Sequence, residues 1–207
     1  MALAAAIVAA LALITVPAGD AAGAGPLCLI PGQATVPVTA YARVSSVHPR
    51  RNYGHAGRWK IDYAPTNARS LIMFGLPKLP MGCGVTDAVL ELRGSYSGTP
   101  GKPDRYPGAS VNLSLVKRHW SESRVTWRNM PPANGCDGGS QDFARTRSWN
   151  VTGMVQEAYR CLGNGGLAAW NGLKAKGWSV PGRGASWRLV VDSRESAHPP
   201  VVKISWG

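Results

Sequence analysis

Apolar and polar residues alternate with a period of two along several short segments of the chain. Within residues 111–115, the side chains of Val111, Leu113 and Leu115 would face one way and those of Asn112 and Ser114 the other. Alternation of this kind between turn residues predicts a strand with one buried face. The same alternation, or a short apolar run, predicts further strands at residues 34–47, 59–63, 69–74, 85–93, 125–127, 167–170, 187–192 and 201–206.

Residues 152–162 instead show the spacing of a helix. Thr152 can cap its start and Gly163 fits the position after its end. Gly- and Pro-rich segments at residues 94–110 and 133–146 are expected to be long loops. Many short strands, long loops and one short helix predict an all-β fold, an antiparallel β-sandwich in a single domain.

The N-terminal segment has the composition of an export signal. Residues 1–16 are almost uninterruptedly apolar and are followed by small residues that include Ala22-Gly23-Ala24, as in a secretory signal peptide. No Lys or Arg precedes the apolar run, which leaves an uncleaved anchor as the alternative. We expect a signal peptide at residues 1–24, a leader at 25–37, and a β-sandwich domain at 38–207 that is secreted or held at the cell surface. No later segment is apolar enough to span a bilayer.

The four cysteines all follow this export segment. An even count in an exported chain predicts disulfides, here two bridges with three possible connectivities. The long spacings and the absence of a C-x-x-C pair argue against a metal site. We therefore expect disulfides, of unassigned pairing, among Cys28, Cys83, Cys136 and Cys161.

The charge of the chain is strongly positive. Its 23 Lys and Arg face 11 Asp and Glu, a formal net charge of +12. Such a charge favours an acidic partner, either nucleic acid, an anionic polysaccharide or wall polymer, or an anionic membrane surface. The other interpretation is that it serves only solubility. Export argues against nucleic acid as the primary partner.

The order of short motifs resembles the DNRLRE-type domain, a family of secreted bacterial β-sandwich modules classed among carbohydrate-binding modules. The motifs are Asn52-Tyr53-Gly54, the strand at 69–74, Leu79-Pro80 with the strand at 85–92, Trp120-Ser121-Glu122 with Val125-Thr126-Trp127 and Pro131, Trp149-Asn150-Val151-Thr152, Asn164-Gly165-Gly166-Leu167, and Asp192-Ser193-Arg194-Glu195. The string that names the family is absent. Gly75 and Asn150 stand where relatives commonly carry acidic residues. The resemblance implies a jelly-roll-like sandwich, no catalysis, and binding of polysaccharide that is often acidic.

Candidate binding residues follow from what acidic sugars require. Aromatic rings stack on pyranose rings, and the Arg fork matches a carboxylate. Basic and aromatic residues interleave around residues 50–60, 117–120 and 183–188. Trp59, Trp120, Trp127, Trp149 and Trp206 are expected in the core, and Arg69 and Glu122 are expected to be structural. The predicted ligand-binding residues are Arg50, Arg51, Tyr53, Arg58, Lys60, Trp170, Trp178, Arg183 and Arg188.

The motifs of the common enzyme classes are absent from the sequence. It contains no G-x-S-x-G, no H-E-x-x-H and no phosphate-binding Gly-rich loop, and its histidines are isolated. We expect no catalytic residues, no metal and no cofactor. The predicted function is a secreted, monomeric, non-catalytic module that binds an acidic glycan or cell-wall polymer. The alternative is a structural spacer or adhesion domain of the cell surface without a sugar site.

Overall fold

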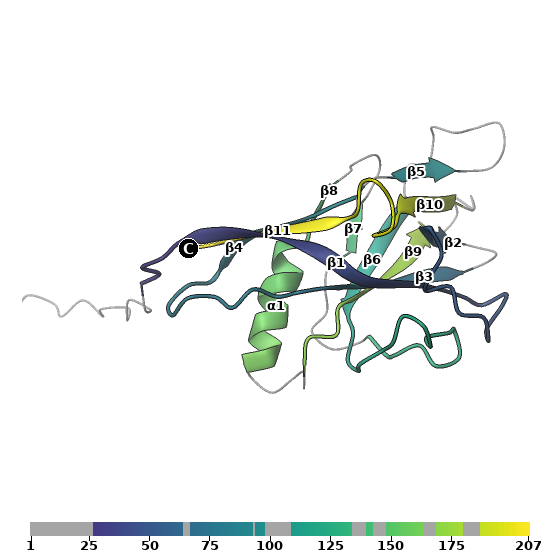
Figure 1. Ribbon diagram of the computed structural model, residues 1–207, viewed down its shortest axis with the longest axis horizontal. Helices are drawn as coiled ribbons and strands as arrows, with labels where there is room; N and C mark the ends of the chain where they lie inside the picture. The colour runs from purple at the N-terminus through teal and green to yellow at the C-terminus, as the bar shows by residue number, and fades with distance from the viewer. Residues whose placement is uncertain are drawn as a thin grey trace, which may run out of the picture.

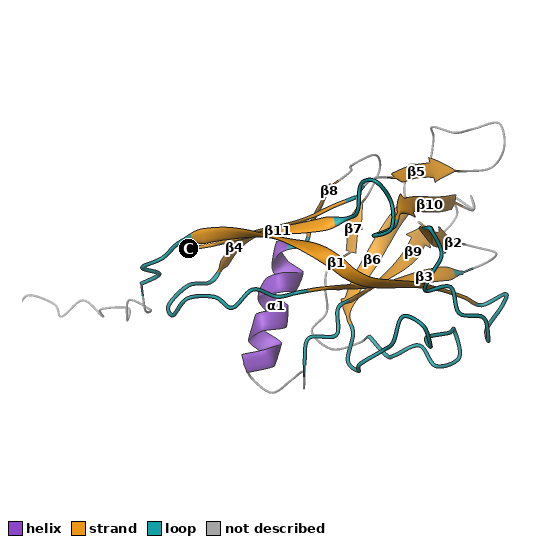
Figure 2. Cartoon of the chain, in the orientation of Figure 1, coloured by secondary structure: helices purple, strands orange, loops and turns teal. Residues whose placement is uncertain are grey.

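The computed structural model describes residues 27–63, 67–92, 94–97, 109–133, 140–142, 148–163, 169–179 and 187–207. Nearly all of the regular structure in these residues is β-strand (Figure 2). The elements are β1 (Gly32–Ser45), β2 (Arg58–Tyr63), β3 (Ala68–Phe74), β4 (Val85–Glu91), β5 (Gly94–Ser97), β6 (Ala109–Leu115), β7 (Ser140–Asp142), β8 (Ser148–Asn150), α1 (Thr152–Gly163), β9 (Leu173–Ser179), β10 (Trp187–Asp192) and β11 (Val201–Trp206).

The described strands form two antiparallel sheets. The larger has eight strands in the order β7-β6-β9-β3-β1-β11-β4-β8, and the smaller has three in the order β2-β10-β5. The long strand β1 pairs with β11 over Gly32–Pro37 and with β3 over Val38–Ser45, with an irregular register between Val38 and Ala40. The large sheet therefore curls about β1, and α1 packs beneath its β11–β4 half (Figure 1).

The inward face of the curled sheet carries the apolar alternation that the sequence predicts. Ile72 and Phe74 of β3 and Val111, Leu113 and Leu115 of β6 are all buried in one core. That core also receives side chains from α1 and from the small sheet. The prediction of an all-β, sandwich-like fold with one short helix is confirmed.

The helix begins at Thr152, as predicted. The Thr152 hydroxyl accepts a hydrogen bond from the Ala88 amide at 2.8 Å, and the Thr152 amide donates to Asn150 Oδ1 at 3.0 Å, so the helix start is tied to β4. About two turns further along α1 the Tyr159 hydroxyl donates to the Pro77 carbonyl, and burial raises the pKa of Tyr159 to about 12. These contacts fix the helix against the sheet.

Several expected elements are placed differently. The predicted strand at 125–127 is wrong, because Thr126 turns back onto Asn129 Oδ1 through its amide at 2.6 Å and through its hydroxyl. No strand covers Ala169 and Trp170, the described part of the strand expected at 167–170, and β9 lies where no strand was predicted. Gly172, with a φ of +81°, makes the turn into β9. β5, β7 and β8 were not predicted as strands.

One disulfide lies at the end of the molecule where the C-terminus also lies. Cys28 is bonded to Cys83, which ties the segment before β1 to the β3–β4 connection. Cys161 is also disulfide-bonded, and Cys136 lies outside the described residues. β1 starts at Gly32, within the segment expected to be a leader. Among the described residues, no helix combines the length and apolarity needed to cross a membrane.

Candidate functional site

The outward face of the β3, β9 and β6 strands is basic and polar. Arg69 of β3 lies opposite Lys176 of β9, which lies opposite Asn112 of β6. Two residues before Lys176 in β9, Lys174 lies opposite Ser114 of β6. Because side chains two residues apart point to the same side of a strand, these side chains form two adjacent rows on the face away from the core.

The 116–133 segment covers only part of this outward face. Val116, Trp120 and Val125 pack on Ala42, Val44 and Leu71, forming a second apolar cluster over β1 and β3. The Trp120 indole N–H donates to the Asn171 carbonyl at 2.9 Å, which ties the segment to the start of β9. Beside this segment Lys176 is exposed and Asn112 and Ser114 are partly exposed, whereas Lys174 is enclosed.

A basic pocket of about 580 Å³ lies where the 116–133 segment borders the outward face of β3, β9 and β6. Its floor is the two polar rows, and its wall is the end of the 116–133 segment with Arg118. The described lining residues are Arg69, Asn112, Ser114, Arg118, Met130, Pro131, Pro132, Ala133, Lys174 and Lys176. No carboxylate is among them, so the pocket has a strongly positive potential.

Lys174 is the most enclosed cation of the pocket, with only 9% of its surface exposed. Burial lowers the pKa of Lys174, and the positive charges of Arg69 and Lys176 lower it further. Burial also lowers the pKa of Arg69. Desolvated like charges are unfavourable until an anion joins them. The arrangement is suited to bind an anionic group.

An aromatic ring holds the Arg69 guanidinium in place. The Arg69 Cζ atom lies 4.6 Å from the centre of the Trp127 ring, within the range of a cation–π interaction. Trp127 is partly buried and packs against the second apolar cluster. Because Arg69 also lines the pocket, its guanidinium is held at the pocket by this contact.

A buried corner positions the 116–133 segment. Glu122 accepts a hydrogen bond from the Tyr41 amide at 3.0 Å and pairs with Arg194 at 2.9 Å. Arg194 also binds Glu195 at 2.8 Å, and this hydrogen bond is the main cause that raises the pKa of Arg194. Burial raises the pKa of Tyr41. As expected from the sequence, Glu122 is structural.

The predicted basic loop forms a separate group. Arg50 and Arg51 are exposed in the segment after β1, and the Cζ atoms of Arg43 and Arg51 lie 4.7 and 5.1 Å from the centre of the Tyr53 ring. Arg58 is exposed at the start of β2, and Lys60 of the same strand is partly buried. None of these residues lines the described part of the pocket.

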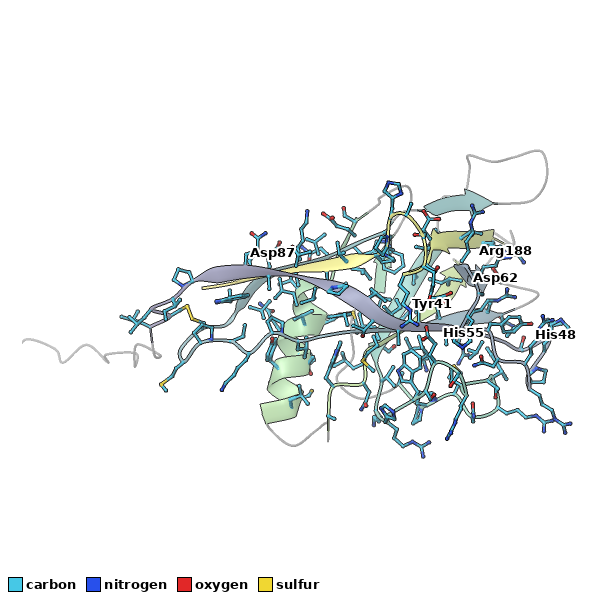
Figure 3. The ribbon with its side chains drawn as sticks, in the orientation of Figure 1. Tyr41, His48, His55, Asp62, Asp87 and Arg188 are labelled. Atoms are coloured by element: carbon cyan, nitrogen blue, oxygen red, sulfur yellow. A yellow bond between two sulfur atoms is a disulfide. The ribbon has the colours of Figure 1, made fainter. Side chains whose placement is uncertain are left out.

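The other predicted residues do not join either group. Arg188 pairs at 2.8 Å with Asp62, which is buried, so this contact joins β10 to β2 (Figure 3). Trp170 was expected to be an exposed platform, but it packs edge-on against Phe74 at 5.1 Å and donates its indole N–H to the Phe74 carbonyl. Arg183 and the side chain of Trp178 lie outside the described residues.

Sequence reasoning missed most of the pocket. Arg69 was assigned a structural role, and Lys174 and Lys176 were neither placed in a strand nor predicted to bind a ligand. Only Arg118 lay in a segment marked for its basic and aromatic residues. The stretch Leu173-Lys174-Ala175-Lys176 alternates apolar and charged residues, a pattern that predicts a strand with one charged face.

The described residues contain no group of three His, Cys, Asp or Glu side chains that could hold a metal ion. The donors of the pocket are ammonium, guanidinium, amide and hydroxyl groups. They can bind and orient an anion that also carries hydroxyl groups.

The comparisons with known proteins agree with a binding role. The family model of carbohydrate-binding module family 96 matches residues 32–205. A search of curated proteins found no match. The resemblance to carbohydrate-binding modules is thus confirmed, whereas the DNRLRE-type label stays a prediction.

Proposed function

The chain belongs to carbohydrate-binding module family 96, and on this premise we propose that it binds an acidic polysaccharide in the basic pocket without catalysing a reaction. The observation that carries the proposal is Lys174, a nearly buried cation beside Arg69 and Lys176 in a pocket whose described lining has no carboxylate. A carboxylate on the sugar would supply the missing counter-charge.

The remaining groups of the pocket suit a sugar. Asn112 offers an amide that both donates and accepts, and Ser114 offers a hydroxyl. A volume of about 580 Å³ lies within the range of small-molecule sites. Met130 and Pro131 add apolar surface against which a ring face can pack. We infer that one uronate unit of a polymer occupies the pocket.

The net charge and the export segment support the same function. A charge of +12 attracts a polyanion from a distance. The apolar N-terminus supports secretion or display at the cell surface, where acidic wall and matrix polymers occur. We propose that the module acts there as a monomer.

The alternative of a spacer or adhesion domain without a sugar site explains the pocket less well. A spacer gains nothing from enclosing Lys174 beside two further cations, since a buried charge without a counter-charge among the described residues destabilises the fold. The pocket is better explained as a site whose cost in stability is offset by a ligand.

A comparison of charged and uncharged polymers tests the proposal. Isothermal titration calorimetry is carried out on the full chain with alginate and polygalacturonate, and with each polymer after its carboxyl groups are reduced to alcohols. We expect binding to at least one uronate polymer and none to its reduced form. Equal binding to both forms, or no binding to either polymer, would contradict the proposal.

A further inference from the structure

We propose that the glycan-binding surface has two parts, the basic pocket and an arginine surface formed by Arg50, Arg51, Arg124 and Arg128, and that one polyuronate chain contacts both. This inference rests on the proposed function and adds the length of chain that the module recognises. All four arginines are exposed. They come from two segments far apart in the sequence, 46–57 and 116–133.

The composition of the two segments makes this surface positive. Segment 46–57 has no Asp or Glu, and the one carboxylate of segment 116–133 is Glu122. Glu122 is already engaged by the Tyr41 amide and by Arg194. The exposed side chains His48 and His55 lie in the same segment as Arg50 and Arg51 (Figure 3). No ion pair of the four surface arginines is found among the described residues.

The two segments are clamped together. The Arg128 amide donates to the Pro49 carbonyl at 3.1 Å. The Asn52 amide group donates to the carbonyls of Glu122 and Val125 at 2.8 and 2.7 Å. Both segments accordingly lie at the same end of the molecule in Figure 1. The arginines therefore sit on a preorganised base, which reduces the entropy lost on binding.

The Tyr53 ring holds part of this surface in place. The guanidinium groups of both Arg43 and Arg51 lie within cation–π distance of the ring. The Nε atom of Arg43 is buried and has no hydrogen-bond partner among the described residues. Two cations are thus held near one ring without a described acidic partner, an arrangement that an anionic ligand would stabilise.

The arginine surface continues into the basic pocket through one short stretch of chain. The Trp127 ring contacts Arg69, which lines the pocket. The backbone amide of the next residue, Arg128, donates a hydrogen bond to the Pro49 carbonyl. Met130, two positions further on, lines the pocket as well. A polymer leaving the pocket past Trp127 would meet the arginine surface next.

A two-part surface predicts a dependence on chain length. A disaccharide that fills the pocket would not reach the arginines, whereas a polymer would gain from both parts through effective concentration. The inference is tested by isothermal titration calorimetry of the full chain with alginate and polygalacturonate, each as polymer and as disaccharide. The variant is Arg50→Gln/Arg51→Gln/Arg128→Gln, and Lys78→Gln/Arg160→Gln/Lys203→Gln is a control with the same change of charge outside both surfaces.

The expected result is a loss of polymer affinity of about tenfold in the arginine variant, with the disaccharide changed by less than about twofold. The charge control should change polymer affinity by less than about threefold. Equal losses for polymer and disaccharide, or equal losses in variant and control, would overturn the two-part surface. Failure of the proposed function looks different, because the unaltered chain would then bind neither ligand, or Lys174→Gln would leave both affinities unchanged.

Discussion

Lys174 is the side chain on which the binding proposal depends most. Its ammonium group is enclosed by the sheet and by two like charges, and burial is the main cause that lowers its pKa. In the unfolded chain the same group would have the usual pKa of a lysine. Folding therefore disfavours the charged form, and the folded state carries this penalty at every pH below the lowered pKa of Lys174.

Replacing Lys174 should consequently stabilise the free protein while removing its function. We expect Lys174→Met to raise the Tm by about 2–4 °C at neutral pH, and to weaken polyuronate binding by at least about tenfold. The gain in Tm should shrink as the pH rises through the lowered pKa of Lys174, because the wild-type lysine then becomes neutral. Differential scanning calorimetry at a series of pH values measures this. The control is Lys78→Met at an exposed site, and a lower Tm for Lys174→Met would count against the account.

Gly54 tests the clamp between segments 46–57 and 116–133. A Cβ atom at this position would lie 2.0 Å from the Glu122 carbonyl oxygen, so the two segments would have to separate. We expect Gly54→Ala to lower the free energy of unfolding by about 2–4 kcal/mol. Gly57→Ala in the same segment is the matched control, since its Cβ would meet nothing within 4 Å. Urea denaturation of both variants measures the difference, and similar stabilities would refute the packing described for Gly54.

At the scale of elements, Glu122 joins β1 to the β10–β11 connection. We expect Glu122→Gln to cost about 1–2 kcal/mol of unfolding free energy, because it keeps an acceptor for the Tyr41 amide but loses the charge that pairs with Arg194. Glu122→Ala, which removes both interactions, should cost more, about 3–5 kcal/mol. Urea denaturation ranks the two variants. Equal costs would show that the hydrogen bond to Tyr41 contributes nothing.

The strands that sequence reasoning found are those with a strong apolar signal. β3, β10 and β11 each combine β-branched or large apolar residues with clear alternation or a continuous run. β9 was missed because its inward side carries the small residues Ala175 and Gly177, which resemble loop composition. The unit at 125–127 has β-forming residues, but the side chain of Asn129 closes a turn there instead.

The basic pocket could not be predicted because its parts meet only through strand register. Arg69, Lys176 and Asn112 lie on three strands that are far apart in the sequence, and no local pattern reports which strands are neighbours. The exposed arginine loop was easier to predict, since Arg50 and Arg51 lie next to each other in the chain. Trp170 was wrongly predicted to be an exposed ligand-binding residue. Its contact with Phe74 cannot be recognised from the composition of the sequence around it.

In the whole molecule, the segment before β1, which carries Cys28 of the Cys28–Cys83 disulfide, and segment 46–57, which carries Arg50 and Arg51, lie at opposite ends (Figure 1). The bridge spans a sequence separation of 55 residues. Its loss should lower the free energy of unfolding by about 2–4 kcal/mol through the greater entropy of the unfolded chain. Because the ligand contacts lie elsewhere, the affinity for polyuronate should not change. Thermal denaturation and calorimetry of Cys28→Ser/Cys83→Ser test both statements, and a large loss of affinity would contradict the separation of the bridge from the binding surface.

A salt titration of the unaltered chain beside Lys174→Gln tests directly whether enclosed positive charge binds an acidic polysaccharide. Affinity for the polyuronate is measured by calorimetry from low to high NaCl concentration. We expect wild-type affinity to fall steeply with salt, because mobile ions screen attraction between the polymer and the basic surfaces. We also expect Lys174→Gln to bind at least about tenfold more weakly at low salt. A wild-type affinity that stays constant across the titration, or a Lys174→Gln variant that binds like the wild type, would contradict the proposed function.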